Sequence, residues 1–198
     1  PDSPIPMVCD MSSDIFSKPI EPHRFGLIYA GAQKNLGPAG VTLVIVRKDM
    51  LGKINRTLPT MLRYETHIQN ESMYNTPPVF PIYVSMLTMR WLKNLGGLAA
   101  MQKINERKAK HVYDVIDSIP FYIGHSVPED RSRMNATFNL EDPALNKEFQ
   151  TYCEEAGCDG VKGHKSVGGF RASIYNAMPE DGVKVLAEVM KEFALKHA

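Results

Sequence analysis

The sequence has few cysteines, and their scarcity excludes two classes of small protein. Among 198 residues there are three, Cys9, Cys153 and Cys158, which are too few and too scattered for a disulfide framework. Cys153 and Cys158 form a poor zinc half-site, because no second pair or suitably spaced histidine follows them. We therefore expect no metal site and a reducing, cytoplasmic setting.

Long apolar runs and an excess of charge are also missing. No apolar run approaches membrane-spanning length and no signal-peptide pattern is present, so we expect no membrane partner. The net charge of +1 gives no reason to expect nucleic acid as a partner. The hydrophobic content of 43% and charged content of 23% are ordinary for a globular protein, with room for one large domain or two small ones.

One stretch, residues 27–40 (LIYAGAQKNLGPAG), is the most informative. It begins as an apolar run, becomes small and polar around Lys34, and ends in Gly/Pro turn residues before a second apolar run at 41–46. Lys34 therefore follows the end of a buried strand, where a partly desolvated amine can act as an imine-forming nucleophile. A solvated loop lysine is the plain alternative. A phosphate loop does not fit, because the spacing is wrong and no Ser or Thr follows Lys34.

A partner for Lys34 lies upstream, where the apolar segment 6–9 ends on Asp10 and two serines. Residues 14–24 are long enough for a crossover between parallel strands, whose carboxyl ends converge on one ligand crevice. An aspartate and a lysine at two such ends are the minimal apparatus for pyridoxal phosphate: the lysine forms the Schiff base and the aspartate pairs with the ring nitrogen. The spacing alone suggests this site without being specific for it.

The rest of the chain predicts further elements. We expect a helical turn at 47–52, an irregular segment at 53–76, and a helix at 79–95 whose Met86, Met89 and Trp91 pack in the core. Gly96–Gly97 marks the domain boundary, and a helix at about 98–118 follows. Its solvated face carries Lys103, Glu106, Arg107, Lys108 and Lys110.

Beyond that helix the sequence predicts a small α/β unit. Strands are expected at 121–124, 134–140, around 161–162 and at 170–175, with a helix opened by Asp142–Pro143 and a last helix from Pro179. Arg171 lies in a strand beside small residues, where a guanidinium can grip a carboxylate, although an edge-strand surface pair is equally compatible. His164 and Lys165 lie in a glycine-flanked loop that suits either an anion or an ordinary polar role.

Four blocks together carry a resemblance: YAGAQKNLGPAG at 29–40, SMYNTPP at 72–78, RSRMN at 131–135 and KGHKSVGGFRASIYNAMP at 162–179. With them the whole chain resembles the phosphoserine aminotransferase family. The resemblance implies an α/β fold, the C-terminal part of a fold-type-I pyridoxal-phosphate-dependent transferase. Residues 1–95 are then the remainder of the large mixed-sheet, cofactor-binding domain, and 96–198 are the small α/β domain. Because the match starts midway along the family's chain, we expect a fragment that is inactive alone.

The resemblance also implies a reaction and its residues. The reaction is transamination between glutamate and 3-phosphohydroxypyruvate, small amino-acid and 2-oxo-acid substrates of serine biosynthesis, with a use in vitamin B6 synthesis also open. Lys34 holds the cofactor and Asp10 its ring nitrogen. By the same resemblance, Gln33 binds the cofactor phosphate. Asn75 and Thr76 bind the cofactor phosphate of the neighbouring subunit, in a homodimer with shared sites. Arg171 binds the substrate carboxylate, and His164 and Lys165 bind the substrate phosphate.

Two other functions stay open. A different fold-type-I enzyme, such as an alanine–glyoxylate aminotransferase, would keep Asp10 and Lys34 but lack the phosphate grip of His164 and Lys165. A chain of another class, an interaction or structural unit without catalysis, is the second.

Overall fold

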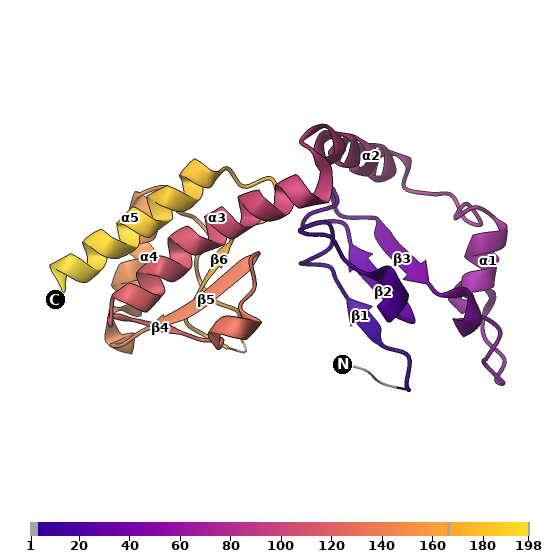
Figure 1. The fold of residues 1–198 in the computed structure, drawn as a ribbon, viewed down its shortest axis with the longest axis horizontal. Coiled ribbons are helices and arrows are strands. Elements are labelled where there is room, and N and C mark those ends of the chain that lie inside the picture. The colour runs from indigo at the N-terminus through magenta and orange to yellow at the C-terminus, as the bar shows by residue number, and fades with distance from the viewer. Residues whose placement is uncertain (1–3, 166, 198) are drawn as a thin grey trace. The chain divides into compact units, whose positions relative to one another are not determined.

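The structure is a computed structural model that describes residues 4–165 and 167–197. The chain divides into two compact units, the first ending at Leu95 and the second beginning at Gly96 (Figure 1). The division falls at the Gly96–Gly97 pair, where both glycines have positive φ angles that other residues rarely adopt. Each unit is described here by itself.

The first unit is built on a three-stranded mixed sheet. Its strands are β1 (Val8–Asp10), β2 (Leu27–Gly31) and β3 (Thr42–Val46), in the order β1-β2-β3. β1 runs parallel to β2, with Asp10 opposite Tyr29, and β3 runs antiparallel to β2. The three expected strands are confirmed. The connection between β1 and β2 holds turns and a short 3₁₀ helix, η1 (Pro22–Arg24), in place of a full crossover helix.

Side-chain alternation separates the two faces of this sheet. Ile28 and Ala30 of β2 are buried in a small core with Met11 and Ile15, which follow β1. Tyr29 lies between them in sequence and is 40% exposed on the opposite face. Because period-2 alternation places Asp10 on the same face as its neighbour Tyr29, the carboxylate is on the open side of the sheet.

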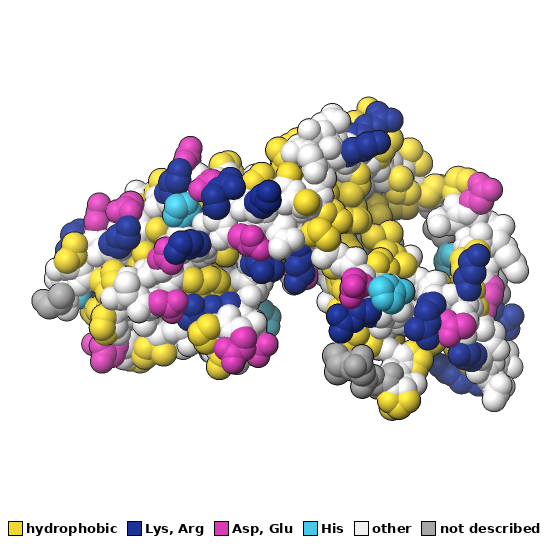
Figure 2. Space-filling model, viewed as in Figure 1, with side chains coloured by type: hydrophobic (Ala, Val, Ile, Leu, Met, Phe, Trp, Pro, Cys, Tyr) yellow, Lys and Arg dark blue, Asp and Glu magenta, His cyan; other side chains and the backbone are white. Residues whose placement is uncertain are grey.

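The segment after β3 corrects two expectations. Residues 53–76 are not structureless, since they contain η3 (Thr60–Leu62) and the helix α1 (Tyr64–Gln69), after η2 (Lys48–Met50). The expected helix at 79–95 is α2 (Val79–Asn94), but its apolar stripe is not a core: Trp91 is 42% exposed, and Met86 and Met89 are half-buried. Hydrophobic side chains gather beneath α2 (Figure 2). The periodicity predicts the helix correctly, but no element among the described residues of this unit covers its outer face.

The second unit packs three helices on one face of an antiparallel sheet (Figure 1). Its elements are α3 (Gly97–Ser118), β4 (Tyr122–Gly124), η4 (Pro128–Asp130), β5 (Asn135–Leu140), η5 (Pro143–Leu145), α4 (Asn146–Glu155), β6 (Phe170–Ser173) and α5 (Glu180–Lys196). The strand order is β4-β5-β6. The strand expected around 161–162 is reduced to an isolated bridge between Lys162 and Phe170. No helix among the described residues has the length and apolar content to cross a membrane.

Aromatic rings fill the space between this sheet and its helices. Phe149 of α4 is fully buried and makes edge-to-face contacts with Phe170 of β6, at 4.7 Å between centroids, and with Phe193 of α5, at 5.0 Å. The hydroxyl of buried Tyr122 donates to the carbonyl of Met190 at 2.6 Å, so its one polar group is satisfied. This packing fixes β6 against the helices.

Lys108 corrects the prediction that it belongs to the solvated face of α3. Its side chain is fully buried, and its ammonium donates to the carbonyls of Ile174 (3.1 Å), Tyr175 (2.7 Å) and Met178 (3.2 Å). One turn earlier, buried Asn105 donates to Asn176 at 2.9 Å. The ammonium satisfies carbonyls of the irregular segment between β6 and α5, which sequence periodicity could not reveal. Burial lowers the pKa of Lys108 to about 8.

The lowered pKa of Lys108 predicts a pH dependence of stability. Between about 8 and its ordinary value of 10.5 the unfolded chain binds more protons than the folded chain, so the unfolding free energy rises with pH in this window and is unaffected by this group below it. Lys108→Met should remove that rise. Urea unfolding from neutral to alkaline pH measures it, with Lys110→Met as the control because Lys110 is exposed and bonded to Asp114. Wild-type and Lys108→Met stabilities that change in parallel would contradict the assignment.

Candidate active site

The end of β1 holds the Asp10 carboxylate in a network of donors. The backbone N–H of Ser12 donates to Asp10 Oδ1 at 2.8 Å and the Ser12 hydroxyl donates to the same oxygen at 2.6 Å. The Tyr29 hydroxyl also hydrogen-bonds the carboxylate. An aspartate that accepts from the N–H two residues on forms an Asx turn, which is how this sequence ends the strand.

Lys34 lies in the turn that follows β2. The N–H groups of Leu36 and Gly37 donate to the Ala32 carbonyl, at 3.2 and 2.8 Å, and close the turn. Buried Asn35 donates through Nδ2 to the carbonyls of Ile15 (3.2 Å) and Ser13 (3.4 Å), residues that follow β1. The lysine turn is therefore tied directly to the segment that carries Asp10.

Gly37 fixes the other side of this turn. A Cβ atom on Gly37 would lie 2.5 Å from the Ser85 hydroxyl and 3.0 Å from the Ser85 Cα in α2. Such distances are too short for any side chain, so the turn can approach α2 only because glycine stands there. Helix α2 thereby supports the turn of Lys34 from behind.

The side chains of Ser12, Tyr29 and Lys34 influence the pKa of Asp10. The Ser12 hydroxyl, followed by the Ser12 N–H, lowers the pKa of the Asp10 carboxyl, and the Tyr29 hydroxyl and the Lys34 ammonium add smaller contributions in the same direction. The neighbouring Asp10 charge in turn raises the pKa of Tyr29. Asp10 is therefore held as an anion, and Asp10 and Lys34 are both exposed on the open side of the unit.

The other residues expected at the cofactor are placed differently. Gln33 is exposed, and its side chain folds over Gly31, where a Cβ would lie 2.6 Å from Gln33 Oε1. Asn75 and Thr76 are exposed, and Asn75 Nδ2 donates to the Thr76 carbonyl at 3.1 Å. Asn75 lines an apolar hollow of about 700 Å³ between β3, α1 and α2, which Asp10 and Lys34 do not line. The structure therefore places Gln33 at the end of β2 beside the turn of Lys34, and Asn75 at a hollow that Asp10 and Lys34 do not line.

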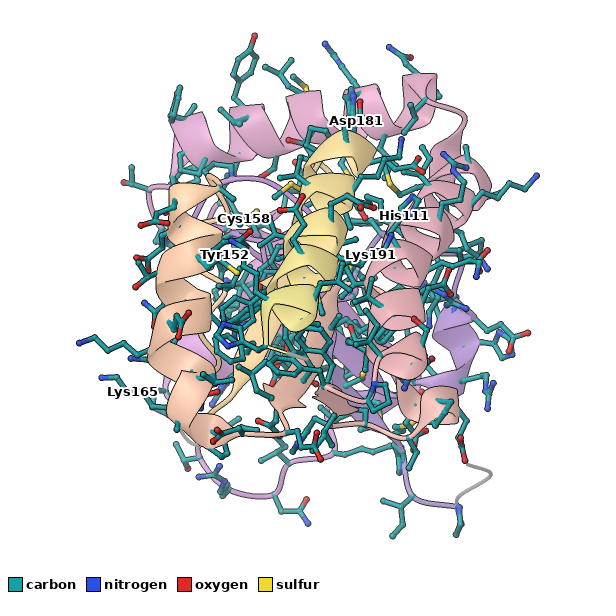
Figure 3. The ribbon with its side chains drawn as sticks, turned by 90° about the vertical axis from the view of Figure 1, so that its left-hand side faces the viewer. His111, Tyr152, Cys158, Lys165, Asp181 and Lys191 are labelled. Atoms are coloured by element: carbon teal, nitrogen blue, oxygen red, sulfur yellow. The ribbon has the colours of Figure 1, made fainter. Side chains whose placement is uncertain are left out.

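His164 and Lys165 are presented by a tight loop of the second unit. Gly163 N donates to the Gly169 carbonyl at 2.8 Å, and a Cβ on Gly163 would collide with the Gly168 carbonyl at 1.9 Å. Both side chains are exposed at the loop, and Lys165 lies at the edge of the unit beside α4 (Figure 3). The loop and the first turns of α4 line a hollow of about 610 Å³, to which Lys147 and Lys162 contribute two more amines.

Arg171 is in the strand that the sequence predicted, β6, which lies at the end of the strand order β4-β5-β6. Phe170 and Ala172 are buried in the core, so alternation places Arg171, opposite Thr137, on the other face of the sheet. The side chain is half-buried, and its Nε is buried without a hydrogen-bond partner among the described residues. No ion pair of Arg171 is found in the described part of the chain, so the surface-pair alternative loses support.

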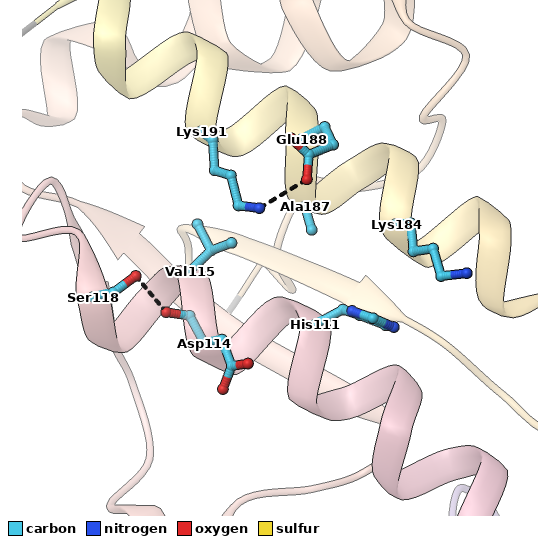
Figure 4. Close-up of a pocket in the computed structure, with 8 residues that line it drawn as sticks. All are labelled: His111, Asp114, Val115, Ser118, Lys184, Ala187, Glu188 and Lys191. Carbon is cyan, nitrogen blue, oxygen red and sulfur yellow. Dashed lines mark hydrogen bonds and ion pairs between the residues drawn. The ribbon is translucent and has the colours of Figure 1, made fainter.

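A further hollow, of about 300 Å³ between α3 and α5, is less suited to a ligand (Figure 4). Its basic side chains already have acidic partners: Lys191 binds Glu188 at 2.7 Å, Lys184 binds Asp181 at 2.9 Å, and the His111 ring contacts Glu180 at 3.0 Å. None of the residues expected to be functional lines it.

Comparisons with known proteins show the family of this chain. A family model described as aminotransferase class-V matches residues 2–186. The chain belongs to the class-V aminotransferase family. The chain is 57% identical over 196 residues to the phosphoserine aminotransferase of Flavobacterium psychrophilum, covering 99% of this chain and 55% of that protein.

Solved structures of this family have the same fold. The phosphoserine aminotransferase of Bacillus circulans subsp. alkalophilus superposes with a TM-score of 0.94 at 48% identity, covering 99% of this chain and 55% of that one. The pyridoxal-phosphate-bound enzyme of Trichomonas vaginalis superposes with a TM-score of 0.91 at 44% identity, covering 96% of this chain and 55% of that one. The predicted fold class is confirmed, and the chain spans about half the length of the relatives it matches.

Sequence reasoning missed three polar residues near these groups. Ser12 and Tyr29 bond Asp10, and Lys147 lines the hollow beside Lys165. The Asp-x-Ser order was a usable signal for Ser12, because this spacing is typical of Asx turns. Tyr29 could be placed beside Asp10 only from the strand register, and Lys147 could be placed at the hollow only from the packing of α4.

Proposed function

We propose that this chain is the C-terminal part of a pyridoxal-phosphate-dependent phosphoserine aminotransferase, which exchanges an amino group between glutamate and 3-phosphohydroxypyruvate. The proposal depends above all on one observation: Asp10 ends β1, Lys34 follows the adjacent parallel strand β2, and Asn35 bonds the turn of Lys34 to the segment that follows Asp10. The identity to phosphoserine aminotransferases over nearly the whole chain supports the same function.

The donor set fits the cofactor. Pyridoxal phosphate, when bound, supplies an electron sink for charge that develops on the substrate α-carbon. Asp10 would keep a proton on the cofactor's ring nitrogen, since an anion held by Ser12 and Tyr29 would stabilise a positive charge placed opposite it. The exposed side chain leaves the carboxylate accessible to the ring.

Lys34 would be the residue that holds the cofactor. Its amine, when free, would act as the base that takes the proton from the substrate α-carbon. Asn35 fixes the turn that carries this amine by donating to the Ile15 carbonyl, so the same group would serve in both roles.

Three amide and hydroxyl residues complete the cofactor site in this proposal. Gln33, beside Gly31, donates to the cofactor phosphate. Asn75 and Thr76 serve the phosphate site of a second subunit, which makes the working protein a homodimer with shared sites in the cytoplasm. Their exposure supports this assignment, because a partner can reach them.

Substrate choice rests on the second unit. A substrate with a carboxylate at one end and a phosphate at the other needs two anion grips. Arg171, whose buried Nε has no partner among the described residues, suits the planar carboxylate, and exposed His164 and Lys165 suit the phosphate. The same phosphate grip would accept the phosphohydroxythreonine of vitamin B6 synthesis.

Lys34 should be the residue that binds the cofactor. A full-length protein containing this chain is incubated with pyridoxal phosphate, reduced with borohydride, and its modified peptide mapped. Label is expected on Lys34, absent from Lys34→Ala and unchanged in Lys48→Ala, a control at another exposed lysine near the sheet. Label on a different lysine would overturn the assignment.

Lys165→Ala and Arg171→Ala should separate the two grips. Each charge-assisted contact is worth roughly 1.5–3 kcal/mol, so Lys165→Ala should raise KM for phosphoserine about 10- to 100-fold and leave alanine and glutamate nearly unchanged. Arg171→Ala should weaken all three substrates, because all share the α-carboxylate. Steady-state kinetics measures both, with Lys191→Ala as a control lysine already paired with Glu188. An equal penalty on all three substrates from Lys165→Ala would favour an alanine–glyoxylate type of enzyme.

A further inference from the structure

The end of β1 leaves one backbone donor of β2 without its regular acceptor. Met11 N donates to the Tyr29 carbonyl at 2.8 Å, the last parallel ladder bond from β1. In a parallel ladder the next bond would run from Gly31 N to the Met11 carbonyl. That carbonyl instead accepts from Asp14 N at 2.9 Å and Ile15 N at 2.7 Å, because the chain turns there.

Ser12 supplies the missing acceptor. Gly31 N donates to the Ser12 hydroxyl oxygen at 3.0 Å. A hydroxyl has one proton to donate, and the Ser12 hydroxyl donates it to Asp10 Oδ1 at 2.6 Å. The chain of bonds therefore runs from Gly31, where the Lys34 turn begins, through Ser12 to the Asp10 carboxylate.

We propose that Ser12 is a positioning residue that holds the Asp10 carboxylate in the orientation needed to face the cofactor's ring nitrogen, and that couples Asp10 to the turn of Lys34 through Gly31. This inference rests on the proposed function. Ser12 touches neither substrate nor reacting atoms in this role, and it acts through Asp10.

The surroundings of Asp10 make Ser12 the dominant partner. From β2 the Tyr29 hydroxyl faces the carboxylate, from the following turn the Lys34 ammonium, and on its own strand the Cys9 thiol is its neighbour. Ser12 gives two hydrogen bonds to one oxygen, and its hydroxyl lowers the pKa of Asp10 more than Tyr29 or Lys34 does. Removing the hydroxyl should therefore raise that pKa even with Tyr29 and Lys34 in place.

The test uses the full-length protein in its cofactor-free form. Binding of pyridoxal phosphate is followed by absorbance as the pH is lowered, in wild type, Ser12→Ala, Ser12→Thr and Ser13→Ala. As the pH is lowered, the affinity for pyridoxal phosphate should begin to fall at a higher pH in Ser12→Ala than in wild type, because Asp10 is protonated at a higher pH. Ser12→Thr should restore the wild-type pH dependence. Ser13→Ala is the matched control, since no bond from its side chain to Asp10 is found in the described residues.

Turnover gives a second reading. Loss of one hydrogen bond to a charged group should lower kcat about 10-fold or more in Ser12→Ala, with KM for glutamate nearly unchanged. If Ser12→Ala does not fold, Ser12→Cys carries the test, since a thiol of similar shape is a weak donor and acceptor.

The outcomes separate the two proposals. Wild-type protein that binds no pyridoxal phosphate at Lys34 overturns the proposed function and this inference with it. If the cofactor binds at Lys34 and its affinity falls at the same acid pH in Ser12→Ala or Ser12→Cys as in wild type, the inference about Ser12 is overturned and the proposed function is not. An equal shift of this pH in Ser13→Ala also overturns the inference.

Discussion

The parallel pairing of β1 with β2 is the constraint on which the site depends. In this register Asp10 lies opposite Tyr29, so the strand that carries the carboxylate ends beside the strand that leads to Lys34. A slip of one residue would turn Asp10 toward the core, where Ile28 and Ala30 are buried. The pattern of buried side chains therefore fixes the side of the sheet on which the anion stands. Asn35 then bonds the lysine turn to the segment after β1, so the segments that follow β1 and β2 are held together by the same two hydrogen bonds.

In the second unit, aromatic packing fixes the register of the strand that carries a proposed site residue. Arg171 must leave the core while its neighbours enter it, and the aromatic contacts of Phe149 with Phe170 hold β6 in that register. The irregular segment after β6 has carbonyls that no regular element satisfies, and the buried ammonium of Lys108 takes three of them. The cost of burying this charge is visible in its pKa, which falls to about 8.

Much of this fold follows from local pattern. The three strands of the first unit, the Gly96–Gly97 division and the last helix are all written in short apolar runs and turn residues. The pattern fails where burial depends on distant partners. The stripe of α2 has helical spacing, but Trp91 remains 42% exposed because periodicity says which residues share a face and not what covers it. The prediction for Lys108 fails in the opposite way: the residue was expected to be exposed, but its ammonium is buried because carbonyls far along the chain accept its hydrogen bonds.

The site divides in the same manner. Asp10 and Lys34 could be paired from the ends of two predicted strands. The roles of Gln33, His164, Lys165 and Arg171 came from resemblance and stay proposals, as do those of Asn75 and Thr76. Ser12 was visible as the residue that ends a strand with Asp10, but its bond to Gly31 depends on where the parallel ladder stops, which no sequence pattern gives.

The central claim is that Asp10 is an anion that holds a proton on the cofactor's ring nitrogen. The most direct measurement is the nitrogen-15 chemical shift of ring-labelled pyridoxal phosphate bound to the full-length protein. The account predicts the shift of a protonated pyridinium at neutral pH in wild type, and of a neutral pyridine in Asp10→Asn. A neutral pyridine nitrogen in the wild-type protein would contradict it.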